Sequence, residues 1–350
     1  ALPGIVPTAG WGFEWGNGPA WDQVLIELPY RIYQYRGLTE AAEICAPAIL
    51  RYILYINSRR DADGLVAIGL GDWCSVSYKG SPESPLIFTD SVTSMEIFRK
   101  SALIFKAVDH RKGYETAKRL YADMRESIRK KMIDFSSMTA LGNCQTSQAM
   151  AIWYNVFDDA EKPDAFKILL KQIKATENHL AVGVVGGRIL FHVLSKYGKT
   201  DLAYEMITRS DCPSYGNWLK RGATTLWENF KSESEEVNSL NHHFWGDISH
   251  WFISALAGIN VNPNCDDINY FEVKPNFAKK LQNVSAWHNS ACGKISVKWE
   301  RTKEDGIILR VITAESMHGK IILPCGWKFT DGSTKKNLQA GNFEIKKIGV

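Results

Sequence analysis

The 350-residue chain lacks any apolar run of the roughly 18 residues that a membrane-spanning helix needs. It also lacks a marked charge of either sign, because 42 Lys and Arg residues stand against 38 Asp and Glu residues, for a net charge of +4. A balance this near neutral gives no argument for a nucleic-acid or anionic-membrane partner. The composition is that of a globular protein with one large domain or two ordinary ones.

The seven cysteines form no recognisable metal-binding or redox motif. None stands in C-x-x-C spacing, and no Cys and His residues cluster at the spacing of a zinc site. The glycines at 183, 186 and 187 are not followed by the Lys-Ser/Thr of a phosphate-binding loop. We therefore expect no metal, and we interpret the cysteines as small buried hydrophobes that do not fix the compartment.

Tryptophan, in contrast, is abundant, with 12 residues. Four segments combine aromatic residues, carboxylates and glycines: residues 10–22, 69–73, 222–228 and 239–247. An indole ring covers the apolar face of a pyranose, and a neighbouring carboxylate accepts hydrogen bonds from sugar hydroxyls. A pair of carboxylates can also cleave a glycosidic bond by acid and base catalysis. The alternative for each single Trp is core packing, but four such loops favour a carbohydrate site.

The period of the apolar residues divides the chain near residue 260. Before it, spacings of three and four predict about ten helices, over residues 21–35, 41–58, 95–105, 117–128, 145–157, 164–177, 187–197, 201–209, 215–219 and 248–256. After it, alternation predicts strands over 295–299, 307–312, 320–323 and 343–348. Helices followed by strands imply separate domains. We predict a helical domain over residues 1–259 and a β domain over residues 260–350.

The aromatic loops also resemble a known family. Gly-Asn-Gly-Pro-Ala-Trp-Asp at 16–22 and Gly-Asp-Trp at 71–73 are similar to segments of family 78 glycoside hydrolases, the α-L-rhamnosidases of Bacteroides type. The most specific stretch is Pro-Ser-Tyr-Gly at 213–216 leading into Gly-Ala-Thr-Thr-Leu-Trp-Glu at 222–228, with Asn-His at 241–242 after it. The resemblance implies an (α/α)6 toroid followed by a small C-terminal β-sandwich. It also implies inverting hydrolysis of terminal α-L-rhamnose without a cofactor.

The same resemblance implies roles for single residues. Glu228 corresponds to the general base that activates water, and His242 to a residue beside the water and the sugar. Substrate contacts are implied for Trp21, Asp22, Asp72, Trp73 and Trp227, and more weakly for Glu14 and Trp15. Structural roles remain open for all of them, because a Glu in a first helical turn is stabilising, and Trp and His also serve in cores.

One family feature is missing from the chain. The resemblance implies a general acid, a Glu in an Asp-Glu-Arg-x-Gly-Trp-like segment upstream of residues 16–22, and no such segment occurs. We therefore expect that the chain begins inside the barrel, that the acid lies upstream, and that the chain alone is nearly inactive.

Other functions stay open from the sequence. A non-catalytic sugar-binding or structural toroid fits a missing carboxylate, and another (α/α)6 glycosidase fits the fold. A polysaccharide lyase fits less well, because the four loops are richer in acids than in Arg or Lys.

The expected partner is a rhamnose-containing oligosaccharide, polysaccharide or glycoside. The predicted location is periplasmic or extracellular rather than cytoplasmic, and the oligomeric state is open. In the β region, Trp287, Trp299 and Trp327 form either a carbohydrate platform or part of a core.

Overall fold

The computed structural model describes residues 2–5, 10, 16–232, 234–262 and 267–349. Glu14 and Trp15, two of the predicted sugar contacts, lie outside these residues. The chain divides into two compact units: unit 1 is Ala1–Arg31, Thr39–Val193 and Met206–Trp245, and unit 2 is Ile32–Leu38, Leu194–Glu205 and Gly246–Val350. In the described part of the chain, no helix has the length and apolar character needed to cross a membrane.

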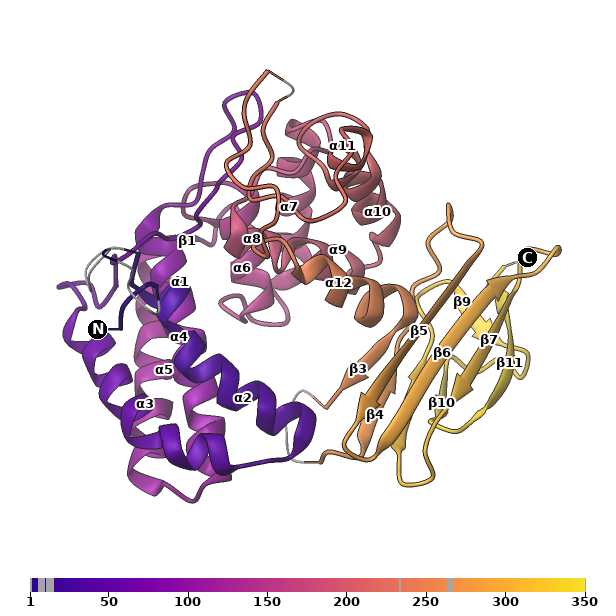
Figure 1. Ribbon diagram of the computed structural model, residues 1–350, viewed down its shortest axis with the longest axis horizontal. Coiled ribbons are helices and arrows are strands. Elements are labelled where there is room, and N and C mark those ends of the chain that lie inside the picture. The colour runs from indigo at the N-terminus through magenta and orange to yellow at the C-terminus, as the bar shows by residue number, and fades with distance from the viewer. Residues whose placement is uncertain (1, 6–9, 11–15, 233, 263–266, 350) are drawn as a thin grey trace. The chain divides into compact units, whose positions relative to one another are not determined.

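Helices predominate as far as Ala257, and the two larger sheets are built from strands that begin at Ile259, which confirms the predicted change near residue 260 (Figure 1). The predicted domain limits themselves stay a prediction. The helices are α1 (Pro19–Asp22), α2 (Val24–Arg36), α3 (Glu40–Ser58), α4 (Leu86–Ala107), α5 (Arg111–Met132), α6 (Gln145–Trp153), α7 (Lys162–Ala175), α8 (Val184–Gly187), α9 (Leu190–Lys196), α10 (Thr200–Thr208), α11 (Tyr215–Lys220) and α12 (Asp247–Trp251).

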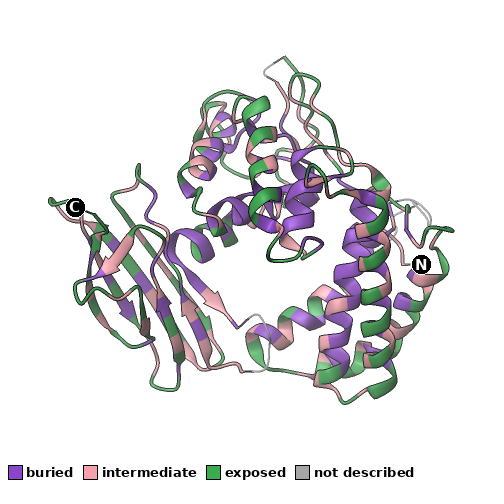
Figure 2. Cartoon of the chain, turned by 180° about the vertical axis from the view of Figure 1, so that it is seen from behind, coloured by how far each residue is buried: buried purple, intermediate pink, exposed green. Residues whose placement is uncertain are grey.

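Helices α4 and α5 show how the apolar pattern selects a position in unit 1. On α5, Leu120, Met124 and Ile128 are each 0% exposed and lie on one face, because their spacing is four residues. Helix α4 is buried on almost every side, including its polar residues Asp90 and Glu96 (Figure 2). Helix α4 is therefore an interior element, and the amphipathic α5 packs against it.

Three predicted helices are wrong in their continuity. The helix predicted from 21 to 35 begins at Pro19 and is interrupted at Gln23, whose side chain donates to the carbonyl oxygen of Ala20 at 2.7 Å. The helix predicted over 187–197 is split into α8 and α9, and the one over 248–256 continues from α12 into a π-helix, Phe252–Ala257. These breaks accompany local hydrogen bonds, such as the one from the Gln23 side chain, which an apolar period does not encode.

A small hairpin was also missing from the prediction. Strands β1 (Ile133–Asp134) and β2 (Thr139–Ala140) pair antiparallel between α5 and α6. Two residues per strand are too few to show an alternating pattern.

The C-terminal region contains two sheets. In chain order, the first contains β3 (Ile259–Val261), β4 (Tyr270–Val273), β8 (His318–Ile322) and β10 (Lys335–Asn337), paired in the order β10-β8-β4-β3. The second contains β5 (Asn283–Ser290), β6 (Gly293–Arg301), β7 (Ile307–Ile312), β9 (Trp327–Phe329) and β11 (Gly341–Lys347), in the order β5-β6-β7-β11-β9. The β4–β8 pair is parallel, and the other described pairs of these sheets are antiparallel.

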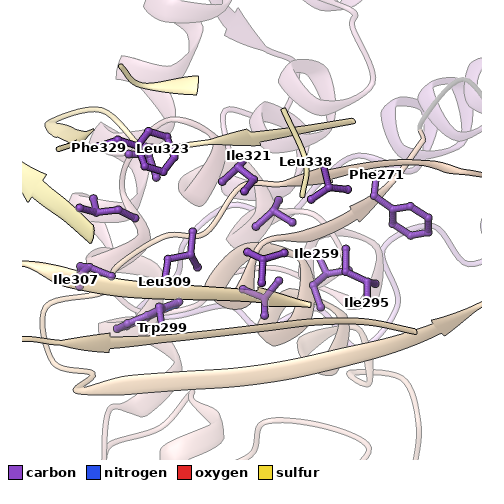
Figure 3. Packing of buried hydrophobic residues seen from close by; sticks show 14 of the residues in the cluster. Ile259, Phe271, Ile295, Trp299, Ile307, Leu309, Ile321, Leu323, Phe329 and Leu338 are labelled. Atoms are coloured by element: carbon purple, nitrogen blue, oxygen red, sulfur yellow. The ribbon is translucent and has the colours of Figure 1, made fainter. Parts of the chain in front are cut away.

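Both sheets contribute to one hydrophobic core (Figure 3). In β6, Ile295, Val297 and Trp299 are each 0% exposed, because alternate side chains of a strand point to the same face. They share the core with Phe271 of β4 and Ile321 of β8. The predicted alternation in this region is confirmed, and it explains why the two sheets bury their apolar faces together.

Candidate functional site

Glu228 and His242 lie on two loop segments that pair through their backbones. The amide of Glu228 donates to the carbonyl oxygen of Ser239 at 2.9 Å, and the amide of His242 donates to that of Leu226 at 2.8 Å. This pairing brings together the two residues for which the sequence predicts the most direct roles. Both side chains are half-buried, so each has a solvent-accessible part.

The main chain of Glu228 is anchored to an aromatic core. The indole nitrogen of Trp245 donates to the carbonyl oxygen of Glu228 at 2.9 Å, and Trp245 is only 2% exposed. The hydroxyl of Tyr215 donates to the carbonyl oxygen of Trp245 at 3.1 Å. A Cβ at Gly187 would come within 2.6 Å of the Trp245 ring, so glycine permits the close packing. These contacts fix the backbone that carries the Glu228 carboxylate.

His242 has a defined hydrogen-bonding state. The amide of Phe244 donates to its Nδ1 at 3.3 Å. Burial lowers the pKa of His242, and the Glu228 carboxylate opposes that shift. A neutral imidazole that accepts at Nδ1 carries its proton on Nε2. His242 can therefore donate a hydrogen bond from Nε2 to a water or a sugar oxygen.

An aromatic row connects this pair to the N-terminal loop. The ring centroid of Phe244 lies 3.7 Å from that of His242 and 5.6 Å from that of Trp21. Trp21 is half-buried, whereas Asp22 is only 2% exposed. The hydroxyl of Tyr52 donates to Asp22 at 3.1 Å, and burial raises the pKa of the Asp22 carboxyl. Trp21 therefore joins the group around His242, while the Asp22 carboxylate faces the interior.

The Asp72 carboxylate accepts hydrogen bonds on both oxygens from within the protein. One oxygen accepts from the Thr146 hydroxyl at 2.5 Å and the Gly183 amide at 2.7 Å. The other accepts from the amides of Val185 at 2.8 Å and Gly186 at 3.0 Å. The carboxylate thus satisfies amides at the start of α8, which have no partner inside that helix. This geometry favours a role for Asp72 in positioning its loop.

The loop that contains Asp72 also approaches Glu228. Trp73 is 39% exposed, and its carbonyl oxygen accepts from the Val184 amide at 2.9 Å. At the next residue, the pKa of the Cys74 thiol is raised to about 11, mainly by burial and in part by the charges of Glu228 and Asp72. The carboxylates of Glu228 and Asp72 therefore lie close enough for their charges to raise the pKa of the same thiol. Trp73 is the residue directly before Cys74 in the chain.

Trp227 lies in a packed aromatic cluster. It is 7% exposed, its ring centroid is 6.0 Å from that of Trp218, and the Arg221 guanidinium carbon lies 5.0 Å from the ring centroid. The ring of Trp218 stacks on Phe230 at 4.0 Å. Sequence reasoning predicts a substrate contact for Trp227, and these contacts favour packing beside the candidate base.

Sequence reasoning missed several residues of this region. Phe244 could have been found from the sequence, because it directly follows His242 and His243 in one of the four aromatic segments. No sequence pattern pointed to Tyr52 or Thr146. The carboxylates that they contact, Asp22 and Asp72, lie 30 and 74 positions away in the chain. The absence of a cofactor and a metal stays a prediction.

Comparison with known proteins identifies the family. Residues 1–256 match a family model described as the bacterial alpha-L-rhamnosidase six-hairpin glycosidase domain. The chain belongs to this α-L-rhamnosidase family. The resemblance inferred from the aromatic loops is thereby confirmed.

Two curated relatives are named α-L-rhamnosidase. One from Alteromonas sp. (strain LOR) is 26% identical over 372 residues, covering 99% of this chain and 40% of the relative. One from Streptomyces avermitilis is 26% identical over 337 residues, covering 93% of this chain and 31% of the relative. The chain thus spans less than half the length of these rhamnosidases.

A solved structure supports the fold. The native α-L-rhamnosidase from Aspergillus terreus superposes with a TM-score of 0.86 at 20% identity, covering 98% of this chain and 40% of that structure. This rhamnosidase-like fold is mainly α-helical with a C-terminal β region, as predicted.

Proposed function

We propose that the protein carrying this chain hydrolyses terminal α-L-rhamnose from glycans or glycosides with inversion, and that Glu228 is the general base. Membership of the α-L-rhamnosidase family supports the reaction class. The observation that carries the residue assignment is the backbone pairing of the Glu228 and His242 segments. This pairing provides a half-exposed carboxylate, next to a histidine that donates from Nε2, on an anchored backbone.

In this proposal, the Glu228 carboxylate removes a proton from a water molecule as that water attacks the anomeric carbon. His242 donates a hydrogen bond from Nε2 to the water or to a sugar hydroxyl. Trp21 and Trp73 offer indole surface to the apolar face of the sugar. Asp22 and Asp72 do not contact the sugar in this proposal. Their carboxylates bond to Tyr52 and to the start of α8, so they position the segments that carry Trp21 and Trp73.

The general acid is a carboxyl group other than Glu228. In an inverting enzyme the two carboxyl groups stand on opposite sides of the sugar, about 6.5–9.5 Å apart, so that a water fits between base and sugar. One carboxyl group cannot protonate the leaving oxygen and deprotonate the water in the same step.

The finer fold assignment belongs to the same proposal: the helical region is an (α/α)6 toroid, and the C-terminal strands form a β-sandwich. The six-hairpin description of the family and the packing of α5 on the interior α4 support the toroid. The shared core of the two sheets supports the sandwich. The periplasmic or extracellular location is likewise a proposal.

Titration with L-rhamnose, followed by calorimetry, tests the proposed binding site without requiring turnover. We expect saturable binding of L-rhamnose, weakened about tenfold or more by His242→Ala, the loss of one well-placed hydrogen bond. His318→Ala, on the exposed surface of β8, is the matched control and leaves the affinity unchanged. Absence of L-rhamnose binding, or equal affinity in wild type and His242→Ala, would contradict the proposal.

A further inference from the structure

Unit 2 contains a cavity that is lined by none of the residues described around Glu228. Its volume is about 900 Å³, within the roughly 300–1,000 Å³ of typical ligand sites. Segments 197–201, 276–282, 301–305, 324–327 and 347–348 contribute its walls, and all of them belong to unit 2. The cavity therefore has its own set of side chains, which the proposed hydrolysis does not use.

One tryptophan of the β region lines this cavity. Trp299 is 0% exposed and belongs to the core, and Trp287 is 56% exposed but does not line the cavity. Trp327 is half-buried and does line it. The Phe277 ring holds Trp327 from one side, at a centroid distance of 5.1 Å and an interplanar angle of 74°. The Lys347 ammonium lies 5.7 Å from the centroid of the same ring. Trp327 thus offers a fixed indole surface beside a cation, and an indole is the usual platform for a pyranose ring.

The charged lining has an excess of cations. Both carboxylates already have lysine partners: Asp305 pairs with Lys347 at 2.6 Å, and Asp201 lies 4.0 Å from the ammonium of Lys279. Lys199 lines the cavity in addition, and it is exposed. The paired charges cancel, so the lining keeps a positive surplus.

Arg301 supplies the most constrained part of this surplus. Its Nε donates to the carbonyl oxygen of Leu281 at 2.9 Å, and its Nη2 donates to those of Phe277 at 2.8 Å and Ala278 at 3.0 Å. These bonds orient the guanidinium without neutralising it. Among the described residues, no carboxylate lies within ion-pair distance of it, and Nη1 makes no hydrogen bond. A half-buried cation held in this way favours an anionic ligand.

We propose that this cavity is a second glycan site, which binds a sugar residue carrying a carboxylate or sulfate group. The pyranose ring lies against Trp327, and Arg301 and Lys199 bind the anionic group. The site attaches the protein to an acidic polysaccharide, and its binding does not depend on the assignment of Glu228.

Calorimetric titration with three tetrasaccharides tests the proposal: oligogalacturonate, a sulfated carrageenan fragment and neutral maltotetraose. We expect at least one acidic probe to bind at least tenfold more tightly than maltotetraose, and the stronger one identifies the anionic group. Lys199→Ala should weaken that binding about fivefold, as expected for an exposed charge contact. Trp327→Ala should weaken it about tenfold or more.

Matched controls are Lys346→Ala, the exposed neighbour of Lys347 on the other face of β11, and Trp287→Ala. Both should change the affinity less than twofold. Because Trp327 packs on Phe277, the exposed Lys199 provides the result if the Trp327 variant does not fold. Failure of both acidic probes to bind, equal binding of maltotetraose, or an equal loss with Lys346→Ala would overturn the proposal.

Discussion

The indole nitrogen of Trp245 donates a hydrogen bond to the carbonyl oxygen of Glu228 at 2.9 Å. Trp245 is 2% exposed and packs against Gly187 and Phe230, whereas Glu228 is half-buried. A rigid aromatic group thus positions the backbone of the proposed general base. The carboxylate is then positioned by the core of unit 1 as well as by its own loop.

Substitution of Trp245 by Phe should distinguish the effect of the hydrogen bond to Glu228 from the effect of ring packing. The ring remains, but the carbonyl oxygen of Glu228 loses its donor, which costs about 1–3 kcal/mol in the free energy of unfolding. Turnover of an aryl rhamnoside should fall as well, because Glu228 becomes less well positioned. The control is Trp251→Phe, since the Trp251 indole donates to Ser195 at 2.9 Å in unit 2. Equal turnover in the two variants would contradict the anchoring role.

Gly69 should tolerate no side chain. Its φ is +92°, and an added Cβ would lie 1.8 Å from the carbonyl oxygen of Asn17, so Gly69→Ala must push two backbone segments apart. Urea unfolding should show a loss of more than about 2 kcal/mol. Gly80 has a φ of +76° but nothing within 4 Å of an added Cβ, so Gly80→Ala should cost only about 1–2 kcal/mol. A similar loss in both variants would argue against the close approach of residues 17 and 69.

Asp90 should make stability depend on pH. It is 0% exposed on α4, and burial raises the pKa of its carboxyl to about 8, although the Ile68 amide donates to it at 2.6 Å. Between the usual carboxyl pKa and about 8, the folded protein keeps the proton and the unfolded chain loses it. The free energy of unfolding therefore falls as pH rises through this interval, by at most about 1.4 kcal/mol per pH unit.

Asp90→Asn should make that slope shallower, because an amide mimics the protonated acid at every pH, while the buried Asp22 and Asp72 still contribute. Urea unfolding at intervals from pH 5 to pH 8 provides the measurement. Asp123→Asn, which changes an exposed carboxylate on α5, is the control and should keep the wild-type slope. Identical slopes in wild type and Asp90→Asn would show that Asp90 titrates alike in both states.

Much of the fold was accessible from the sequence, because long elements repeat their pattern several times. The spacing of Ala117, Leu120, Met124 and Ile128 predicts the buried face of α5 correctly, and alternation predicts β6. The break at Gln23 and the π-helix that follows α12 were not predicted. They depend on individual hydrogen bonds and on a left-handed residue, Gly258, with φ 86°.

The candidate site was accessible only in part. Motif resemblance selected Glu228 and His242, which the structure brings together. It could not show which way Asp72 and Trp227 face, since that depends on distant partners. The Asp72 carboxylate meets amides more than 110 positions away, and Trp227 is covered by Trp218 and Arg221. The sequence pattern of a Trp beside an acidic residue is the same in a sugar-binding site and in a hydrophobic core.

The most direct test of the account is the turnover of a natural rhamnoside by the whole protein with Glu228→Gln, measured together with L-rhamnose affinity. The amide keeps the shape of Glu228 but cannot take a proton, so we expect kcat to fall by about 10²–10⁴-fold with an unchanged Kd for L-rhamnose. Glu236→Gln, an exposed change between the two paired segments, should leave both quantities at the wild-type level. Near-normal kcat in Glu228→Gln would contradict its assignment as the general base.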